Sequence, residues 1–198
     1  MNIAIMVEGN TEVAFIDPLR GYLRQHLAGA MPRLVSRTYD GRIPKADRLR
    51  RQVRLLLNGH DRVIALTDVH TGSRDFTDAA DAKMKMRTWV GKEPRFHPHA
   101  AQHDFEAWLL PYWLRIQELA GSDRTAPSPN PESVNHGRPP ARHLAEIYRT
   151  GSRGRSYVKT RDAAAILRDA DLSVAIAACT ELRALVNTIL TICGAASV

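Results

Sequence analysis

The chain is 198 residues long, with 44% hydrophobic and 25% charged residues, close to the averages of globular proteins. This composition excludes a disordered or fibrous protein, and the length fits one compact domain with a sizeable core. The formal net charge is +7 at pH 7, and most basic residues are arginines, so nucleic acid leads among polyanionic partners. Charge alone also leaves open a basic soluble protein without such a partner.

The cysteines and the apolar runs indicate a cytoplasmic protein. Cys179 and Cys193 lie in an apolar helical stretch, a spacing that gives neither a disulfide framework nor a zinc motif, so we expect two buried thiols. The N-terminal apolar run ends at Glu8, too early for a signal peptide, and charged residues interrupt the apolar stretch 172–193. We therefore expect no membrane segment.

Strand and helix patterns alternate from the N-terminus onward. Residues 2–7 form a continuous apolar run, which is typical of a parallel strand buried on both faces. Residues 11–28 predict a helix that Pro18 kinks or breaks, because a proline ring clashes with the carbonyl four residues earlier. A second strand is expected at 33–38 and an amphipathic helix at 46–57.

The same unit repeats in the middle of the chain. Residues 62–67 predict an apolar strand that delivers Asp68 at its end, and residues 76–90 predict a helix. A shorter strand at 95–101 contains Pro98, which cannot donate to a sheet ladder, so we expect it at an edge or with a bulge.

The remainder of the chain is expected to be mostly helical. Residues 105–119 predict a helix rich in tryptophan and leucine, and residues 121–140 predict a long flexible loop because Pro, Ser, Asn, Gly and Arg dominate them. Residues 142–148 and 162–193 are expected to be helical, separated by a basic segment that contains glycine.

This alternation predicts an α/β, Rossmann-like fold with a mostly parallel sheet flanked by helices and a helical C-terminal part. We expect an α/β core over 1–120, the flexible loop over 121–140, and a helical segment over 141–198 packed on the core, in a single domain. Ligands in such sheets gather at the carboxyl ends of the strands.

Acidic residues occupy two of these strand ends. Glu8 and Asp68 each follow an apolar strand, and Glu12 lies four residues after Glu8. One such carboxylate alone is usually a helix cap or the partner of an arginine. A converging set repels itself unless it is partly protonated or binds a cation. Mg²⁺ prefers such oxygen ligands, so the set predicts a magnesium or manganese site.

A third strand-to-helix junction, "HDFEAWLL", adds two more acids. Asp104 and Glu106 precede an amphipathic helix. They are candidates for the same metal site, but Asp104 as a helix cap and Glu106 as a partner of the helix dipole is the alternative.

These segments carry a family resemblance. "VEGNTE" after a buried strand, then "LTDVH", then "HDFEAWLL" resembles a Toprim-type catalytic core, the fold shared by topoisomerases, primases and the overcoming-lysogenization-defect (OLD) nucleases. With the later "PPARHLAEIY" and "YVK" segments, the order resembles a bacterial family of small uncharacterised Toprim-like proteins over nearly the whole chain.

The resemblance implies a set of site residues. It makes Glu8 and Asp68 the principal acids and Glu12 and Glu106 accessory metal ligands. It also implies a basic residue near the scissile phosphate, for which Lys159 is the candidate because its charge would stabilise the transition state; a lysine on a solvated face is the alternative.

One position departs from the family pattern. The usual Asp-x-Asp pair is Asp68-Val69-His70 here. Imidazole is a poor Mg²⁺ ligand that Mn²⁺ accepts, so the metal preference shifts or a water replaces the carboxylate. We expect His70, His103 and Asp104 to orient a ligand or a water. A zinc site at the histidines of residues 97–103 is the disfavoured alternative, since no cysteine accompanies them.

Two basic segments are candidate phosphate contacts. We expect nucleic-acid binding at Arg48 and Arg51 in the first and at Arg153 and Arg155 in the second, with a solvated helix face as the alternative for the first.

The sequence thus predicts a divalent-metal-dependent phosphodiesterase or nuclease that acts on DNA or RNA with Mg²⁺ or Mn²⁺. The resemblance implies an antiphage or mobile-element setting beside an ABC- or SMC-type ATPase, which would supply ATP chemistry because this chain has no P-loop motif. A second copy of the chain is left open as a partner. The alternatives are a catalytically silent scaffold that binds nucleic acid or an ATPase, and a phosphotransfer enzyme of another α/β type.

Overall fold

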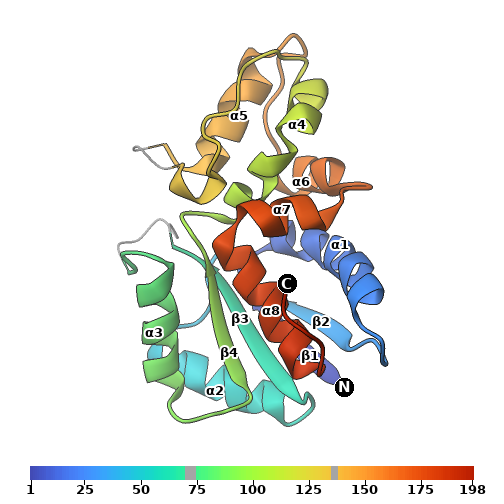
Figure 1. The fold of residues 1–198 in the computed structure, drawn as a ribbon. Helices are drawn as coiled ribbons and strands as arrows, with labels where there is room; N and C mark the ends of the chain where they lie inside the picture. The colour runs from blue at the N-terminus through green and yellow to red at the C-terminus, as the bar shows by residue number, and fades with distance from the viewer. Residues whose placement is uncertain (70–74, 135–137) are drawn as a thin grey trace.

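A four-stranded, all-parallel sheet lies at the centre of the protein, with helices packed against both of its faces (Figure 1). The structure is a computed structural model that describes residues 1–69, 75–134 and 138–198. The strand order is β2-β1-β3-β4, with β1 at Asn2–Val7, β2 at Arg33–Thr38, β3 at Arg62–Asp68 and β4 at Phe96–Ala101. The predicted α/β class, the parallel sheet and the edge position of β4 are confirmed.

The two faces of the sheet build separate hydrophobic cores. Ala4 and Met6 face one side, where they pack with α2 (Ala46–Leu57) and α3 (Ala79–Val90). Ile3 and Ile5 face the other side, which is covered by α1 (Asn10–His26) and α8 (Thr180–Ile192). Because successive side chains of a strand point to opposite faces, a continuous apolar run fills both cores.

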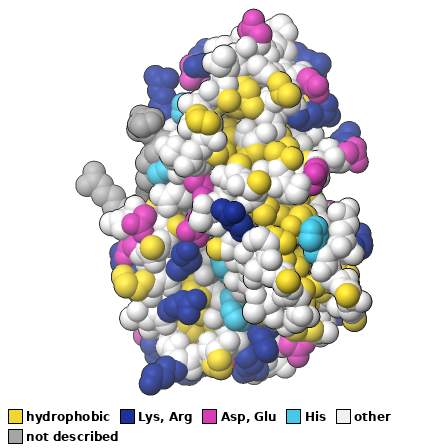
Figure 2. Space-filling view, in the orientation of Figure 1, with side chains coloured by type: hydrophobic (Ala, Val, Ile, Leu, Met, Phe, Trp, Pro, Cys, Tyr) yellow, Lys and Arg dark blue, Asp and Glu magenta, His cyan; other side chains and the backbone are white. Residues whose placement is uncertain are grey.

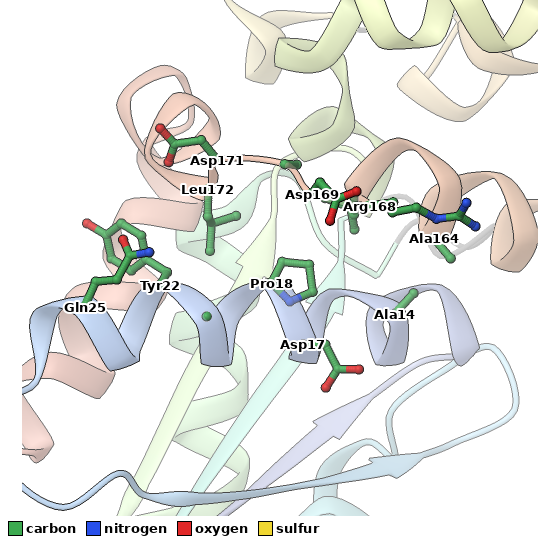
Figure 3. Close-up of a pocket in the computed structure, with 13 residues that line it drawn as sticks. Ala14, Asp17, Pro18, Tyr22, Gln25, Ala164, Arg168, Asp169, Asp171 and Leu172 are labelled. Atoms are coloured by element: carbon green, nitrogen blue, oxygen red, sulfur yellow. The ribbon is translucent and has the colours of Figure 1, made fainter.

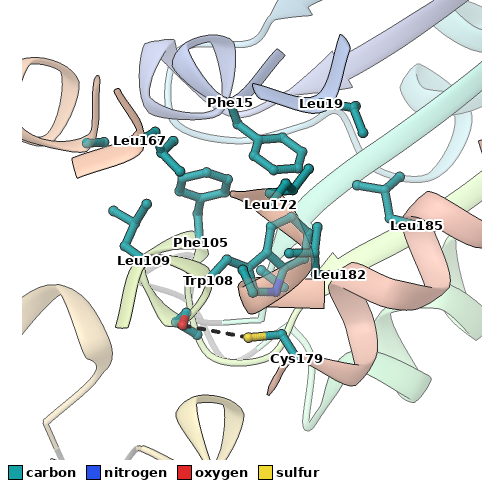
Figure 4. Packing of buried hydrophobic residues seen from close by; sticks show 14 of the residues in the cluster. Phe15, Leu19, Phe105, Trp108, Leu109, Leu167, Leu172, Cys179, Leu182 and Leu185 are labelled. Atoms are coloured by element: carbon teal, nitrogen blue, oxygen red, sulfur yellow. Dashed lines mark hydrogen bonds between the residues drawn. The ribbon is translucent and has the colours of Figure 1, made fainter. Parts of the chain in front are cut away.

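Aromatic rings pack α1 against η1, the 3₁₀ helix at Phe105–Tyr112. The ring of Phe15 on α1 lies 5.8 Å from the rings of Phe105 and Trp108, measured between centroids, and these two lie 5.5 Å apart (Figure 4). Cys179 is buried beside them, with Sγ 3.9 Å from the Ala107 carbonyl oxygen. The expectation of two buried thiols is therefore met at Cys179 only, because Cys193 is partly exposed.

The prediction of one continuous helix at 105–119 is wrong. Residues Phe105–Tyr112 form a 3₁₀ helix, η1, and an α-helix, α4, follows at Trp113–Ala120. Pro111 lies within the last turn of η1 and has no N–H to donate, which prevents one continuous α-helix.

The helix predicted at 162–193 is three helices. They are α6 at Lys159–Leu167, α7 at Leu172–Ala178 and α8 at Thr180–Ile192. Asp171 begins α7 by accepting a hydrogen bond from the Ser173 N–H. Cys179 has extended backbone angles and ends α7, and α7 and α8 meet at 117°.

Pro18 does not break α1, which runs continuously from Asn10 to His26. Its ring leaves the Ala14 carbonyl without the usual helical donor. Ala14 and Pro18 both line a surface pocket, so this helix face is accessible and the exposed carbonyl costs little.

A helical unit extends beyond the carboxyl edge of the sheet (Figure 1). Its main parts are α4, α5 (Pro140–Thr150) and α6, with a short 3₁₀ helix, η2, at Pro131–Ser133 inside the predicted loop. The Gly121 carbonyl accepts a hydrogen bond from the Ser152 N–H, 2.7 Å away, which joins the ends of α4 and α5.

Within the described ranges no single helix is both long and apolar enough to cross a membrane; the bent pair α7 and α8 meets that test only when taken together.

Candidate functional site

A pocket of about 210 Å³ lies at the carboxyl end of the sheet and is lined by acidic residues. Its walls are Glu8, Gly9, Thr11, Glu12, Gly41, Asp68 and Lys159. Glu8 follows β1 directly and Asp68 ends β3, and these strands are neighbours. The topology therefore brings together the two acids that the sequence singled out, and Glu12 and Lys159 join them.

Glu8 is fixed in the pocket by its neighbours on β3. Its Oε1 accepts hydrogen bonds from the Thr67 hydroxyl and from the Asp68 N–H, the latter at 3.2 Å. The side chain is buried, and burial raises its pKa to about 7 even though the two hydrogen bonds lower it. Thr67 is a positioning residue that sequence reasoning missed. Its signal was its place directly before Asp68 at a strand end.

Glu12 is in the first turn of α1. Its Oε2 accepts a hydrogen bond of 3.0 Å from the Gly9 N–H, so it caps the start of its own helix. Burial raises its pKa, and the charge of Glu106 adds to the effect. This carboxylate has a local structural role in addition to its place in the pocket.

Asp68 lies at the end of β3 among the other acids. Burial raises its pKa well above the usual value, and the negative charges of Glu8 and Asp104 raise it further. The raised pKa values mean that these carboxyls hold their protons more tightly than usual in the metal-free protein.

Asp104, directly before η1, and Glu106, within it, do not line the pocket but are buried next to it, where Glu106 contacts Lys159. Asp104 does not cap η1. Instead its Oδ2 accepts a hydrogen bond of 3.1 Å from the Ala141 N–H, which ties it to the first turn of α5. Burial and the charge of Glu106 raise the pKa of Asp104 to about 7.

Lys159 supplies a positive charge to this cluster. It is the first residue of α6, and its Nζ lies 3.0 Å from Glu106 Oε1. Burial lowers the pKa of Lys159, but the charge and hydrogen bond of Glu106 and the charges of Asp68 and Asp104 together outweigh burial, so the net effect is a raised pKa. In the described part of the chain, Glu106 Oε2 and Asp104 Oδ1 are buried without a hydrogen-bond partner.

Among the described residues, no three His, Cys, Asp or Glu side chains are already arranged to hold a metal ion. His70 lies outside the described residues. His103 is buried beside Asp104 with a left-handed backbone, φ 71°.

The other two histidines of residues 97–103 lie elsewhere: His99 is buried in the core, and His97 is half-buried and lines a surface pocket. His97 and His99 lie on β4, paired with Ile64 and Leu66 of β3. Burial lowers the pKa of His99 to about 3, so this ring is neutral at pH 7.

The predicted phosphate contacts fall into two groups. Arg48 and Arg51 are exposed on α2, and Arg153 is exposed before α6. Arg155 differs, because its guanidinium lies 2.9 Å from both oxygens of buried Asp162 and over the Tyr148 ring. Arg155 therefore has a structural role that the basic pattern did not indicate.

A larger pocket, about 510 Å³, lies away from the acids, between α1 and residues 164–172 (Figure 3). Two of its acids already have partners: Asp17 forms an ion pair of 2.8 Å with Arg20, and Asp171 caps α7. It shares no residue with the acidic pocket.

Family comparison places the chain. The model of a family described as a domain of unknown function, DUF4276, matches residues 7–190. The chain belongs to this family. No curated protein matches it.

A solved structure is similar to this DUF4276 protein over nearly its whole length. It is the C-terminal region of the Burkholderia pseudomallei OLD protein, with a TM-score of 0.57 and 14% sequence identity, covering 97% of this chain and 98% of that one. At this identity the likeness shows a shared fold: a parallel sheet flanked by helices, as the sequence predicted.

Proposed function

We propose that this protein is a divalent-metal-dependent phosphodiesterase that cleaves DNA or RNA, with a Toprim-like acidic site at the carboxyl end of its sheet. The observation that carries the proposal is the pocket in which Glu8, Glu12 and Asp68 converge beside Lys159. The fold shared with the C-terminal region of an OLD protein supports it.

The chemistry of the donors fits Mg²⁺ or Mn²⁺. The candidate ligands among the described residues are carboxylates, which both ions prefer over neutral donors. His70 as an additional ligand would favour Mn²⁺. Buried oxygens at Asp104 and Glu106 have no hydrogen-bond partner in the described part of the chain. Such oxygens are costly to bury and are open to a cation. Glu8 and Asp68 would hold the principal ion, and Glu12 and Glu106 would complete its shell or hold a second one.

When bound, a divalent ion would activate water and stabilise the leaving oxygen of a phosphodiester. The chain's own groups have distinct tasks. Thr67 and the Asp68 N–H hold Glu8 Oε1 and so fix the position of this carboxylate in the pocket. Lys159 has a side chain that is 53% exposed, so its ammonium can reach both Glu106 and a phosphate oxygen at the pocket mouth.

A second candidate function is a silent scaffold that binds nucleic acid or an ATPase. Two features of the described residues favour it. Glu8 and Glu12 accept hydrogen bonds from the protein itself. No three His, Cys, Asp or Glu side chains among these residues are arranged as metal ligands. Loss of the second acid of the Asp-x-Asp pair, at His70, points the same way.

Cleavage assays separate the two functions. Purified protein would be incubated with plasmid, single-stranded DNA and total RNA, in Mn²⁺ or Mg²⁺, beside Glu8→Gln. The control is Glu118→Gln, a mostly exposed acid on α4 paired with Arg115. We expect the wild type and Glu118→Gln to cleave and Glu8→Gln to show only background. Equal cleavage by all three would indicate contamination, and cleavage by none would favour the scaffold.

A further inference from the structure

A row of arginines that the sequence analysis did not single out lies on one face of α5 and just before it. Arg138, Arg142 and Arg149 line a groove of about 380 Å³ together with Ala145 and Glu146. All three arginines are exposed. Figure 2 shows Lys and Arg side chains at the upper left of the molecule, where Figure 1 draws α5. We call this surface the α5 groove.

Positive charge is in excess along this surface. Residues 138–153 contain four arginines and a single acid, Glu146. Glu146 is shared between Arg124, at 3.1 Å, and Arg138, at 3.4 Å. Arg142 and Arg149 have no ion-pair partner among the described residues, so their guanidinium groups remain available to an external anion.

Two arginines of the neighbouring basic segment are less available to an external anion. Buried Asp162 binds Arg155 and Arg161, each at 2.9 Å. Arg155, which the sequence analysis places among the phosphate contacts, therefore neutralises an internal carboxylate together with Arg161. The α5 groove therefore holds much of the accessible positive charge of the helical unit.

The first turn of α5 lies beside the buried acid Asp104. Asp104 accepts a hydrogen bond from Ala141 in the first turn of α5, and the helix then runs away from the sheet (Figure 1). Arg142 and Arg149 are seven residues apart, two helical turns, so they share a face about 10 Å apart along the helix axis. A duplex strand places about three phosphates along that length at 3.4 Å each.

We propose that the α5 groove binds the phosphodiester backbone of a nucleic acid and leads the strand to the acidic pocket. The inference takes its ligand class from the proposed function, but it does not require hydrolysis. Guanidinium groups in such a row contact phosphates without reading the base sequence, so binding is electrostatic and weakens with salt.

The test is binding without metal. Fluorescence anisotropy of labelled single-stranded and duplex oligonucleotides would be measured in EDTA over a series of salt concentrations. We expect Arg142→Gln/Arg149→Gln to bind more weakly and to reduce the salt slope by about 1.4 for a single strand or 1.8 for a duplex, the loss of two phosphate contacts. The matched control is Arg24→Gln/Arg33→Gln, two exposed arginines near the amino end of the sheet.

This binding experiment tests the α5 groove independently of catalysis. An unchanged affinity and salt slope in Arg142→Gln/Arg149→Gln would overturn the inference, as would equal loss in the control or no binding by the wild type at 50 mM salt. Circular dichroism confirms that each variant is folded. If the protein neither cleaves nucleic acid nor binds metal, but Arg142→Gln/Arg149→Gln weakens binding as expected, then the proposed hydrolysis is wrong and nucleic-acid binding by the α5 groove is supported.

Discussion

Lys159 Nζ lies 3.0 Å from Glu106 Oε1, so a lysine from α6 neutralises a carboxylate of η1 that has no exposed surface. The two residues are far apart in the sequence and meet only because α6 packs on η1 across the carboxyl edge of the sheet. In the metal-free protein the chain itself supplies a cation to its acidic pocket.

Removing the positive charge of Lys159 is expected to increase the stabilisation that a bound metal ion gives. Lys159→Met should lower the free energy of unfolding in EDTA by about 1–2 kcal/mol, less than a fully buried pair would lose because Lys159 is half exposed. Added Mn²⁺ should then raise the thermal midpoint of the variant more than that of the wild type. Lys85→Met, which removes a lysine paired with Asp81 on α3, is the control. Equal metal responses in wild type and Lys159→Met would contradict the expectation.

Glu8→Gln is expected to stabilise the metal-free protein at high pH. Burial raises the pKa of Glu8 to about 7, so the folded state binds its proton more tightly than the unfolded state. Ionisation at pH 8 therefore costs stability, and that cost disappears as the pH falls below 4.5. In EDTA the variant should be more stable than wild type by about 1–3 kcal/mol at pH 8 and nearly equal at pH 4.5.

Urea unfolding at the two pH values measures this difference, with Glu118→Gln expected to stay within about 0.5 kcal/mol of wild type at both. A Glu8→Gln protein that is less stable at pH 8 would show that the Glu8 carboxylate is held favourably without metal.

Thr67→Val tests how Glu8 is positioned. The change keeps the side-chain shape and removes the hydroxyl that donates to Glu8 Oε1. We expect a loss of about 1–2 kcal/mol in unfolding free energy and a roughly 10- to 100-fold weaker metal affinity, as for a group that orients a ligand. Thr88→Val, whose hydroxyl donates to the Met84 carbonyl on the surface of α3, should change neither. Normal metal affinity in Thr67→Val would remove Thr67 from the site.

The Asp162 carboxylate should contribute strongly to the stability of the helical unit. Burial opposes its charge, but hydrogen bonds from Arg161, the Val158 N–H and Arg155 outweigh burial and lower its pKa. Its stabilisation is therefore present above pH 3.8 and is lost as the pH falls below that value. Asp162→Asn should cost about 2–4 kcal/mol at pH 7, because it leaves arginines beside an uncharged group.

Chemical denaturation at pH 7 checks this cost. Asp17→Asn, which breaks a surface pair with Arg20, should stay within about 0.5 kcal/mol of wild type. A similar small effect in Asp162→Asn would mean that its arginines find other partners.

Local sequence patterns predicted the strands of the sheet and the acids at their ends. The apolar runs gave the four strands, and because β1 and β3 are adjacent, Glu8 and Asp68 meet at one edge. Helix ends were harder. Proline within η1 and a capping aspartate before α7 each interrupted a helix that apolar periodicity predicted as continuous.

Partnerships between distant segments were not predictable from spacing. Asp104 has the sequence signature of a cap for the helix that follows it, yet it binds Ala141 of α5. Arg155 belongs to a basic cluster that reads as solvent-exposed, yet Asp162 and the Tyr148 ring hold it. Both outcomes depend on tertiary packing, which overrides a local signal.

The central claim is that the pocket of Glu8 and Asp68 binds a divalent ion, and calorimetric titration of Mn²⁺ tests it most directly. The account predicts binding by the wild type at pH 8, weaker binding at pH 6 because protons then occupy carboxyls such as Glu8, whose pKa is about 7, and no binding by Glu8→Gln at either pH. No heat of binding by the wild type at millimolar Mn²⁺, or equal affinity in wild type and Glu8→Gln, would contradict it.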